Sequence, residues 1–380
     1  MQIVLRRAWV SAVALAGLIA ASAAQADALL DEAVAFNGAI LHLQMEAPGL
    51  IVAAVKDGET AVMGFGETRR GSGIEPDGDS VFRIGSITKA FAGEMLAHSA
   101  TRGEVVFTDK AGDLLQGRLG EALAEHPPMR LVELATHAAG LPREVPRAES
   151  PADDPFANIT YDAFADWLEA NPLHFAPGSS IAYSNFGFDI LSAALSEAGG
   201  KPYADLLAER ITGPLDMADT GFELTEAKAG RVMAGHAPDG TPLPTFPSGS
   251  VITGSGGLYS TANDLLRWMQ WHLDHGEPDA EVRLLDHLIY TQRDGMDAVL
   301  AMDESGRMDA MGLGWVAMAP TAERPFILQK AGALQGQMSY LAFAPEHGTA
   351  VFVSINQFDF AGAYAMTEFA NSFLADLSGF

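Results

Sequence analysis

Ser86 and Lys89 stand three residues apart in Ser86-Ile87-Thr88-Lys89, and the pattern around them predicts a helix from Ser86 to Thr101. On a helix, this spacing places both side chains on one face. A serine hydroxyl is a weak nucleophile that needs a neighbouring base, and a Lys whose pKa is lowered by burial can be that base. N–H groups at the helix N-terminus would stabilise the negative charge that develops on an attacked carbonyl. The pair predicts a nucleophile and its activator, although Ser-x-x-Lys alone more often marks surface helix residues.

Two further groups of polar residues follow in chain order. Tyr183-Ser184-Asn185 precedes a helical run, where a Tyr can relay a proton and an Asn amide can hold a Lys ammonium or a substrate carbonyl. A buried aromatic beside a helix cap is the alternative interpretation. Lys330-Ala331-Gly332 falls at the end of a predicted strand, where the Lys can bind a substrate carboxylate and the Gly lets substrate approach the backbone. A β-turn with an exposed Lys is the alternative here.

The elements that must position these residues follow an α/β (α+β) pattern, with strands at both chain ends and helices in the middle. Strands are expected at 50–55, 60–65, 81–84, 312–318, 326–330, 337–344 and 349–356, and helices at 28–46, 86–101, 258–275 and 361–377. Asp57-Gly58 is a strong hairpin signal between the first two strands. The pattern predicts one antiparallel sheet built from both ends, flanked by terminal helices. We expect a single catalytic domain over 27–380, with sheet regions at about 27–85 and 250–380 and a mainly helical region at about 86–249.

Together, the three motifs resemble those of the serine β-lactamase and penicillin-binding-protein superfamily, in its class C-like branch. That branch has Ser-x-x-Lys, Tyr-x-Asn and Lys-Thr-Gly or a close variant. The segments Phe82–Lys89, Leu134–Pro142 and Pro214–Met217 are typical of the surroundings of these motifs, and the resemblance covers nearly all of the mature chain. It implies a β-lactamase/transpeptidase-like fold and acylation of Ser86 by substrate.

The resemblance also implies a role for each motif residue. Lys89 and Tyr183 would share general-base work, with Tyr183 passing a proton to the leaving nitrogen. Asn185 would orient Lys89 and the substrate amide. Lys330 would bind the substrate carboxylate, and the N–H groups of Ser86 and Ala333 would form the oxyanion hole. Gly332 would let the substrate approach the strand backbone closely.

Two positions depart from the family pattern and bear on substrate choice. Ala331 replaces the usual Thr or Ser of the third motif, so a hydroxyl that would hold a substrate carboxylate is missing. Glu144 lies near the position where class C enzymes carry a Gln. We predict that its carboxylate contacts the free amine of a stem peptide that contains diaminopimelate.

Residues 1–26 have the build of a secretory signal peptide. Arg6 and Arg7 precede an apolar run from Ala8 to Ala20, and Ala24-Gln25-Ala26 is a small-x-small cleavage site. The run is short for a membrane span, although a membrane anchor is the alternative. We expect export to the periplasm, without a stable membrane anchor after cleavage. Sec and Tat export are both left open.

The composition excludes several other classes of function. The chain has no Cys, which removes disulfides and thiolate chemistry, and a formal net charge of −26 disfavours nucleic acid as a partner. Its ten His residues show no His-Glu-x-x-His or comparable spacing, so no metal and no other cofactor is expected. The absence of a Gly-x-Ser-x-Gly elbow argues against an α/β-hydrolase.

The leading hypothesis is a D-alanyl-D-alanine carboxypeptidase/endopeptidase whose partners are peptidoglycan peptides and β-lactams. A class C-like β-lactamase and a carboxylesterase on the same scaffold are the alternatives. A non-catalytic penicillin-binding sensor is a fourth reading. It is disfavoured because a protein that only binds has no need for Ser86, Lys89 and Tyr183 together.

Overall fold

The computed structural model describes residues 28–146, 149–151 and 153–380, so the signal peptide predicted over 1–26 lies outside the described residues. An eight-stranded sheet runs in the order β2-β1-β12-β11-β10-β9-β8-β6, and all its neighbours are antiparallel. Its strands are β1 (Gly49–Lys56), β2 (Glu59–Gly66), β6 (Thr291–Gln292), β8 (Ala310–Met311), β9 (Val316–Met318), β10 (Ile327–Leu334), β11 (Gln337–Ala344) and β12 (Thr349–Ile355). The predicted antiparallel sheet built from both chain ends is confirmed, since β1 pairs with β12.

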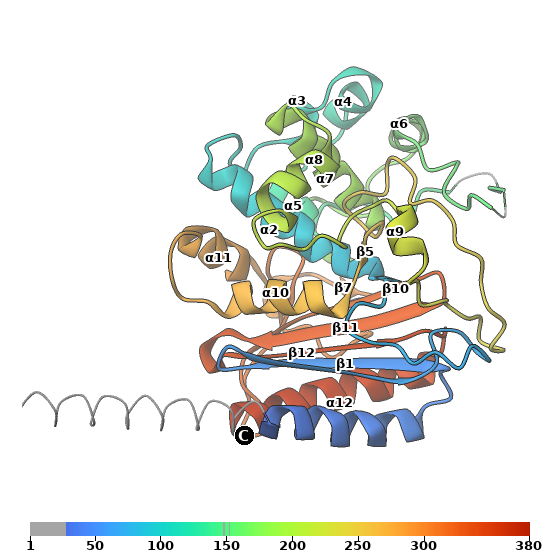
Figure 1. Ribbon diagram of the computed structural model, residues 1–380. Helices are drawn as coiled ribbons and strands as arrows, with labels where there is room; N and C mark the ends of the chain where they lie inside the picture. The colour runs from blue at the N-terminus through green and yellow to red at the C-terminus, as the bar shows by residue number, and fades with distance from the viewer. Residues whose placement is uncertain (1–27, 147–148, 152) are drawn as a thin grey trace, which may run out of the picture.

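The sheet separates two hydrophobic cores because successive strand residues point to opposite faces. In β1, Ile51 and Val55 pack into the core under the helical region, while Leu50 and Val52 pack into the core under the terminal helices. The terminal helices are residues 28–44 and α12 (Phe360–Ser378), which lie side by side against one face of the sheet (Figure 1). All four of these β1 side chains are fully buried, so the strand is apolar on both faces.

The middle of the chain forms the helical region over the other sheet face (Figure 1). Its helices are α2 (Thr88–Thr101), α3 (Ala111–Leu114), α4 (Gly117–Ala124), α5 (Leu131–Ala135), α6 (Tyr161–Ala170), α7 (Asn185–Gly199), α8 (Tyr203–Leu207) and α9 (Glu226–Ala229). Two helices follow later in the chain. The first, α10 (Ala262–Leu273), lies between this region and the sheet, and the second, α11 (Ala280–His287), lies to one side. Among the described residues, no helix is both long enough and apolar enough to cross the hydrocarbon layer of a membrane.

A short strand pair fixes the start of the helix that carries Ser86. β3 (Phe82–Arg83) pairs with β5 (Tyr259–Ser260), and one 3₁₀ turn, η1 (Gly85–Ile87), leads from β3 into α2. The Arg83 guanidinium is buried and donates to the carbonyl oxygen of Gly257 at 2.8 Å. The turn that presents Ser86 is therefore anchored to the segment before α10, which is about 170 residues away in sequence.

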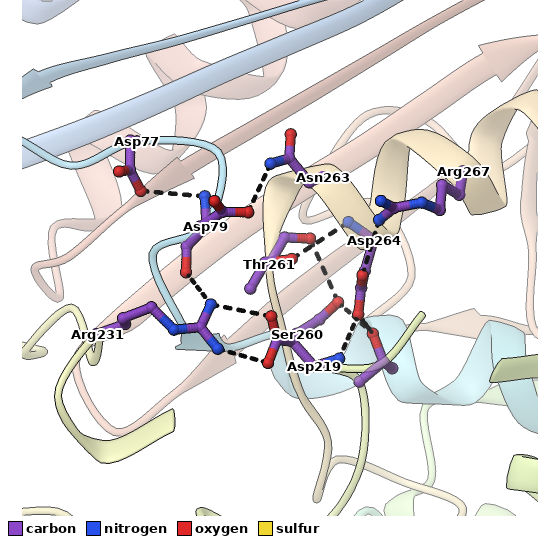
Figure 2. A network of polar contacts seen from close by, with 10 residues as sticks. Asp77, Asp79, Asp219, Arg231, Ser260, Thr261, Asn263, Asp264 and Arg267 are labelled. Carbon is purple, nitrogen blue, oxygen red and sulfur yellow. Dashed lines mark hydrogen bonds and ion pairs between the residues drawn. The ribbon is translucent and has the colours of Figure 1, made fainter. Parts of the chain in front are cut away.

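A polar network reinforces this anchor (Figure 2). Arg231 donates to both carboxylate oxygens of Asp219, at 2.9 and 2.6 Å, and to the carbonyl oxygen of Asp79 at 2.8 Å. Asn263, at the start of α10, donates to the Asp79 carboxylate at 2.7 Å. The loop before β3 is thereby tied to the N-terminus of α10.

Several predicted boundaries were wrong, and the strand expected at 312–318 begins only at Val316, as β9. The strand expected at 326–330 continues through the third motif to Leu334, because β10 pairs with β11 from Leu328 to Leu334, including Ala331 opposite Tyr340. Tertiary pairing overrides the turn signal of Ala331-Gly332, and Lys330 lies inside a strand with 2% exposure. The helix expected from 258 begins only at Ala262, after Thr261 accepts a capping hydrogen bond.

Candidate active site

Ser86 is half-buried in the 3₁₀ turn η1 that leads into α2, and its hydroxyl has two hydrogen-bonding neighbours. Lys89 Nζ lies 3.0 Å from Ser86 Oγ, and Tyr183 OH lies 2.6 Å from it. The predicted pair and the predicted Tyr therefore converge on one oxygen, although Tyr183 is about a hundred residues away in sequence. This oxygen has one candidate base and one candidate proton donor in direct contact.

Lys89 is fully buried, and every hydrogen-bonding position of its amine is used. Besides Ser86, it contacts Asn185 Oδ1 at 2.6 Å and the Ser255 carbonyl oxygen at 2.5 Å. Burial lowers the pKa of Lys89 to about 7, with Asp189 acting in the opposite direction. A neutral amine can donate its two hydrogens to Asn185 and Ser255, and its lone pair then accepts the Ser86 proton.

Asp189 supports this arrangement from one turn further along α7, and the sequence reasoning missed it. Its carboxylate accepts hydrogen bonds from the N–H and the hydroxyl of Ser255, both at 2.9 Å. Ser255 in turn offers its carbonyl oxygen to Lys89. Burial raises the pKa of Asp189, and the Lys89 charge opposes that shift. The group acts on Lys89 through Ser255 and through its own charge.

The Tyr183 ring is fixed by a buried His and surrounded by positive charge. His137 stacks on it with ring centroids 4.6 Å apart, and His137 Nδ1 accepts the N–H of Ser184 at 3.0 Å. Lys89, Lys330 and Arg143 lie over the ring at 4.9, 5.3 and 4.5 Å from its centroid. Burial lowers the pKa of Lys330 to about 8. These cations stabilise negative charge on the Tyr183 oxygen when its proton is transferred.

A cavity of about 440 Å³ opens in front of Ser86. Its polar wall holds Tyr183, Lys330 and Arg143, and the third-motif residues line it as well. Its other wall is apolar and aromatic, from Met302, Met338, Phe358, Phe360, Tyr364 and Met366. The cavity has space for a small peptide end beside a cationic patch, and Arg143, which sequence reasoning did not single out, is part of that patch.

Two glycines bring the Ser86 turn and β10 into contact. A Cβ on Gly332 would lie 2.0 Å from the Ile84 carbonyl oxygen and 2.9 Å from Ser86 N, and one on Gly85 would lie 2.6 Å from Ala333 N. Gly85 also has a φ of +50°, which disfavours other residues. The peptide nitrogens of Ser86 and Ala333 are thus held at one edge of the cavity, as an oxyanion hole requires.

Asn185 links Lys89 to Glu144. The Asn185 amide nitrogen donates to the Glu144 carboxylate while its oxygen accepts from Lys89. Glu144 is exposed, but it is not among the described residues that line the cavity at Ser86. Its contact with a substrate amine stays a prediction.

Comparisons with known proteins cover almost the whole chain. Residues 26–372 match the family model described as Beta-lactamase. The chain is 36% identical over 340 residues to the D-alanyl-D-alanine-carboxypeptidase/endopeptidase AmpH of Escherichia coli strain K12, which covers 88% of this chain and 86% of that protein. It is 27% identical over 356 residues to penicillin-binding protein 4 of Amycolatopsis lactamdurans, covering 89% and 88%. The crystal structure of a beta-lactamase/D-alanine carboxypeptidase from Yersinia pestis, complexed with citrate, superposes with a TM-score of 0.80 at 33% identity and covers 92% of this chain and 98% of that one.

Proposed function

The chain belongs to the beta-lactamase family and is a serine hydrolase, as its motifs predict, and from this premise we propose its function. We propose that it is a periplasmic D-alanyl-D-alanine carboxypeptidase/endopeptidase. It would act on peptidoglycan stem peptides and bind penicillin. The observation that carries the proposal is the contact of Ser86 Oγ with both Lys89 and Tyr183, beside a cavity that contains Lys330 and Arg143. Two cations next to the nucleophile suit a substrate with a free carboxylate one residue beyond the cleaved bond. The predicted signal peptide supports the periplasmic location.

Acylation then follows from the hydrogen bonds. Neutral Lys89 takes the Ser86 proton as Ser86 Oγ forms a bond to the carbonyl carbon of the penultimate D-alanine. The carbonyl electrons move onto oxygen, where the N–H groups of Ser86 and Ala333 stabilise them. The C–N bond breaks as Tyr183 gives its proton to the leaving nitrogen, and the proton held by Lys89 restores Tyr183. Water releases the acyl group through the same groups in reverse.

Binding of the substrate carboxylate is the step at which this chain differs from its family's motif. Ala331 offers no hydroxyl, so we assign the carboxylate to the Lys330 ammonium and the Arg143 guanidinium. Arg143 is also within ion-pair distance of Glu304, at 3.7 Å, and both side chains are exposed. A substrate carboxylate would compete with Glu304 for Arg143. Breaking the Arg143–Glu304 pair costs little free energy, because a solvent-exposed ion pair contributes little stability.

The test uses the mature chain with a fluorescent penicillin, a pentapeptide muropeptide, nitrocefin and a p-nitrophenyl ester. We expect covalent labelling that Ser86→Ala abolishes, and release of D-alanine from the muropeptide. Arg143→Ala should raise the KM for the muropeptide about tenfold or more, since a charge-assisted hydrogen bond is worth ~1.5–3 kcal/mol. The same variant should leave the KM for the ester nearly unchanged, because the ester carries no carboxylate, and any loss of kcat through Tyr183 should be common to both substrates.

Each alternative function has its own outcome in this experiment. Rapid nitrocefin turnover without D-alanine release would establish the class C-like β-lactamase. Ester turnover alone would establish the carboxylesterase. Stable labelling with no turnover of any substrate would leave a penicillin-binding sensor, and labelling that survives Ser86→Ala would overturn the assigned nucleophile.

A further inference from the structure

A second cluster of chemically capable side chains lies away from Ser86, at the C-terminal ends of α10 and α11. It consists of His272 from α10 and of Asp286 and His287 from α11. The His272 and Asp286 side chains are completely buried and that of His287 is 17% exposed. None of the three lines the described cavity at Ser86, so the proposed hydrolase chemistry does not use them.

The donor atoms of the cluster form a small triangle. His272 Nδ1 lies 2.9 Å from His287 Nε2 and 3.7 Å from Asp286 Oδ2, and His287 Nε2 lies 3.9 Å from the same oxygen. One point inside this triangle is about 2.1 Å from all three atoms, which is the length of zinc–nitrogen and zinc–oxygen bonds in proteins, ~2.0–2.2 Å. Two imidazoles and a carboxylate are also a ligand set that zinc commonly takes.

Two polar atoms of the cluster are left without a protein partner. Among the described residues, neither Asp286 Oδ1 nor His272 Nε2 has a hydrogen bond. A buried carboxylate without an opposite charge is costly. The described ion pairs give Asp286 only the two His residues, and no Lys or Arg. The neighbouring cation, Arg283, instead donates to the carbonyl oxygen of Gly276.

The surroundings hold the carboxylate in place and keep the cluster dry. Trp315 Nε1 donates to Asp286 Oδ2 at 2.8 Å, a bond of the kind that orients metal-ligating carboxylates. The His272 ring stacks on Phe343 and meets the Trp315 ring edge-on, with centroids 5.0 and 5.2 Å apart. A cation there would be screened little by solvent and would face the Asp286 carboxylate directly.

We propose that His272, Asp286 and His287 bind one zinc ion, with His272 Nδ1, His287 Nε2 and the Asp286 carboxylate as ligands. Asp286 Oδ1 can supply the fourth ligand, because it belongs to the same carboxylate and has no other partner. Binding requires the proton between the two imidazoles to move to an outer ring nitrogen. The ion joins α10 to α11, and α11 packs directly on α2, so its role is to brace the helix that presents Ser86 from behind.

The test measures the metal content of the mature chain produced with added Zn²⁺ or Co²⁺. We expect one Zn²⁺ per chain by mass spectrometry, a melting temperature several degrees above that of the metal-free protein, and visible absorption bands of four-coordinate Co²⁺. Asp286→Asn and His287→Gln keep side-chain volume and should lower the bound metal below about a tenth of an equivalent.

His275→Gln is the matched control, because His275 is exposed in the loop that follows α10. It should retain the full equivalent of metal. Circular dichroism and covalent penicillin labelling check that each variant is folded. Wild-type protein without bound zinc and without a thermal shift would overturn the proposal, leaving a closed network of neutral side chains. Equal metal content in wild type and Asp286→Asn would overturn it too.

Discussion

At the scale of single residues, the burial of Lys89 has a direct kinetic consequence. Its pKa is lowered to about 7 by desolvation, so the fraction of neutral amine grows as the pH rises toward that value. We expect the rate of Ser86 acylation by penicillin to rise nearly tenfold per pH unit below about pH 7 and to level off above it. Stopped-flow labelling from about pH 5 to 9 measures this, and a flat profile would exclude Lys89 as the base.

The charge of Asp189 should set the midpoint of that profile. Because the Asp189 carboxylate raises the pKa of Lys89, Asp189→Asn should move the midpoint to lower pH while the plateau rate falls only modestly. Ser255→Ala removes one hydrogen bond that favours the charged form of Asp189, so its midpoint should move in the same direction but by less. An unshifted midpoint in Asp189→Asn would show that Asp189 is uncharged when Lys89 titrates.

The third prediction concerns the missing hydroxyl at Ala331. Ala331 lines the cavity and lies in a strand, where a β-branched residue is well tolerated. Ala331→Thr should therefore increase the acylation rate with penicillins about tenfold, since one added hydrogen bond to a carboxylate is worth ~1.5–3 kcal/mol. Ala331→Val adds the same bulk without a hydroxyl. An equal gain in both variants would attribute the effect to packing.

The sequence predicts the residues that meet at Ser86 Oγ but only some of those that position them. Ser86, Lys89 and Tyr183 meet at one oxygen, as the motifs predict. His137 was expected to be structural rather than a ligand, but its stacking on Tyr183 was not predicted, and Asp189 had no sequence signal, because its hydrogen bonds to Ser255 are tertiary contacts. Such contacts join segments distant in sequence, and a single sequence does not show which distant segments meet.

At the scale of elements, the approach of β10 to the Ser86 turn decides whether an oxyanion can be stabilised. Gly332→Ala would place a Cβ 2.0 Å from the Ile84 carbonyl oxygen and force the two backbones apart. We expect acylation to slow by about a hundredfold or more, the usual cost of losing one oxyanion donor. Gly230→Ala is the matched control, since a Cβ there meets nothing within 4 Å. Near-normal acylation in Gly332→Ala would contradict this role.

The misplaced end of β10 shows how local signals lose to pairing. Ala331 and Gly332 are poor strand formers, and a Lys-Ala-Gly run looks like the start of a turn. In the sheet, Ala331 pairs with Tyr340 and Gly332 pairs with Ser339 on β11. This pairing with β11 extends strand β10 beyond Lys330. By contrast, the hairpin at Asp57-Gly58 was predictable because its signal is local, and both residues have the positive φ that such turns need.

At the scale of the whole molecule, the formal net charge of −26 should weaken the folded state at low ionic strength. Like charges repel more strongly in the compact form than in the extended chain, and added salt screens them as the Debye length falls from ~30 Å to ~10 Å. We expect the melting temperature to rise by a few degrees between about 0.01 and 0.1 M NaCl. A fall over this range would mean that attractive surface ion pairs outweigh the repulsion.

The antiparallel sheet was predictable as a whole because alternation and turn residues mark its long strands at both ends of the chain. The short strands β6 and β8 and the helix α11 were not expected. They have two, two and eight residues, and each is held mainly by packing against neighbours. The cluster of His272, Asp286 and His287 shows no metal-ligand spacing in the sequence, because its residues come from two helices.

The distribution of the catalytic parts along the chain also matters during synthesis. Ser86 and Lys89 leave the ribosome early, whereas β10, which forms the facing edge of the site, follows more than two hundred residues later. Strand β1 must wait even longer for its second partner, because β12 ends at Ile355. A prematurely terminated chain would thus carry the nucleophile without the strand that stabilises the oxyanion. We therefore expect incomplete copies to be inert and hydrolytic competence to arise only when translation is nearly finished.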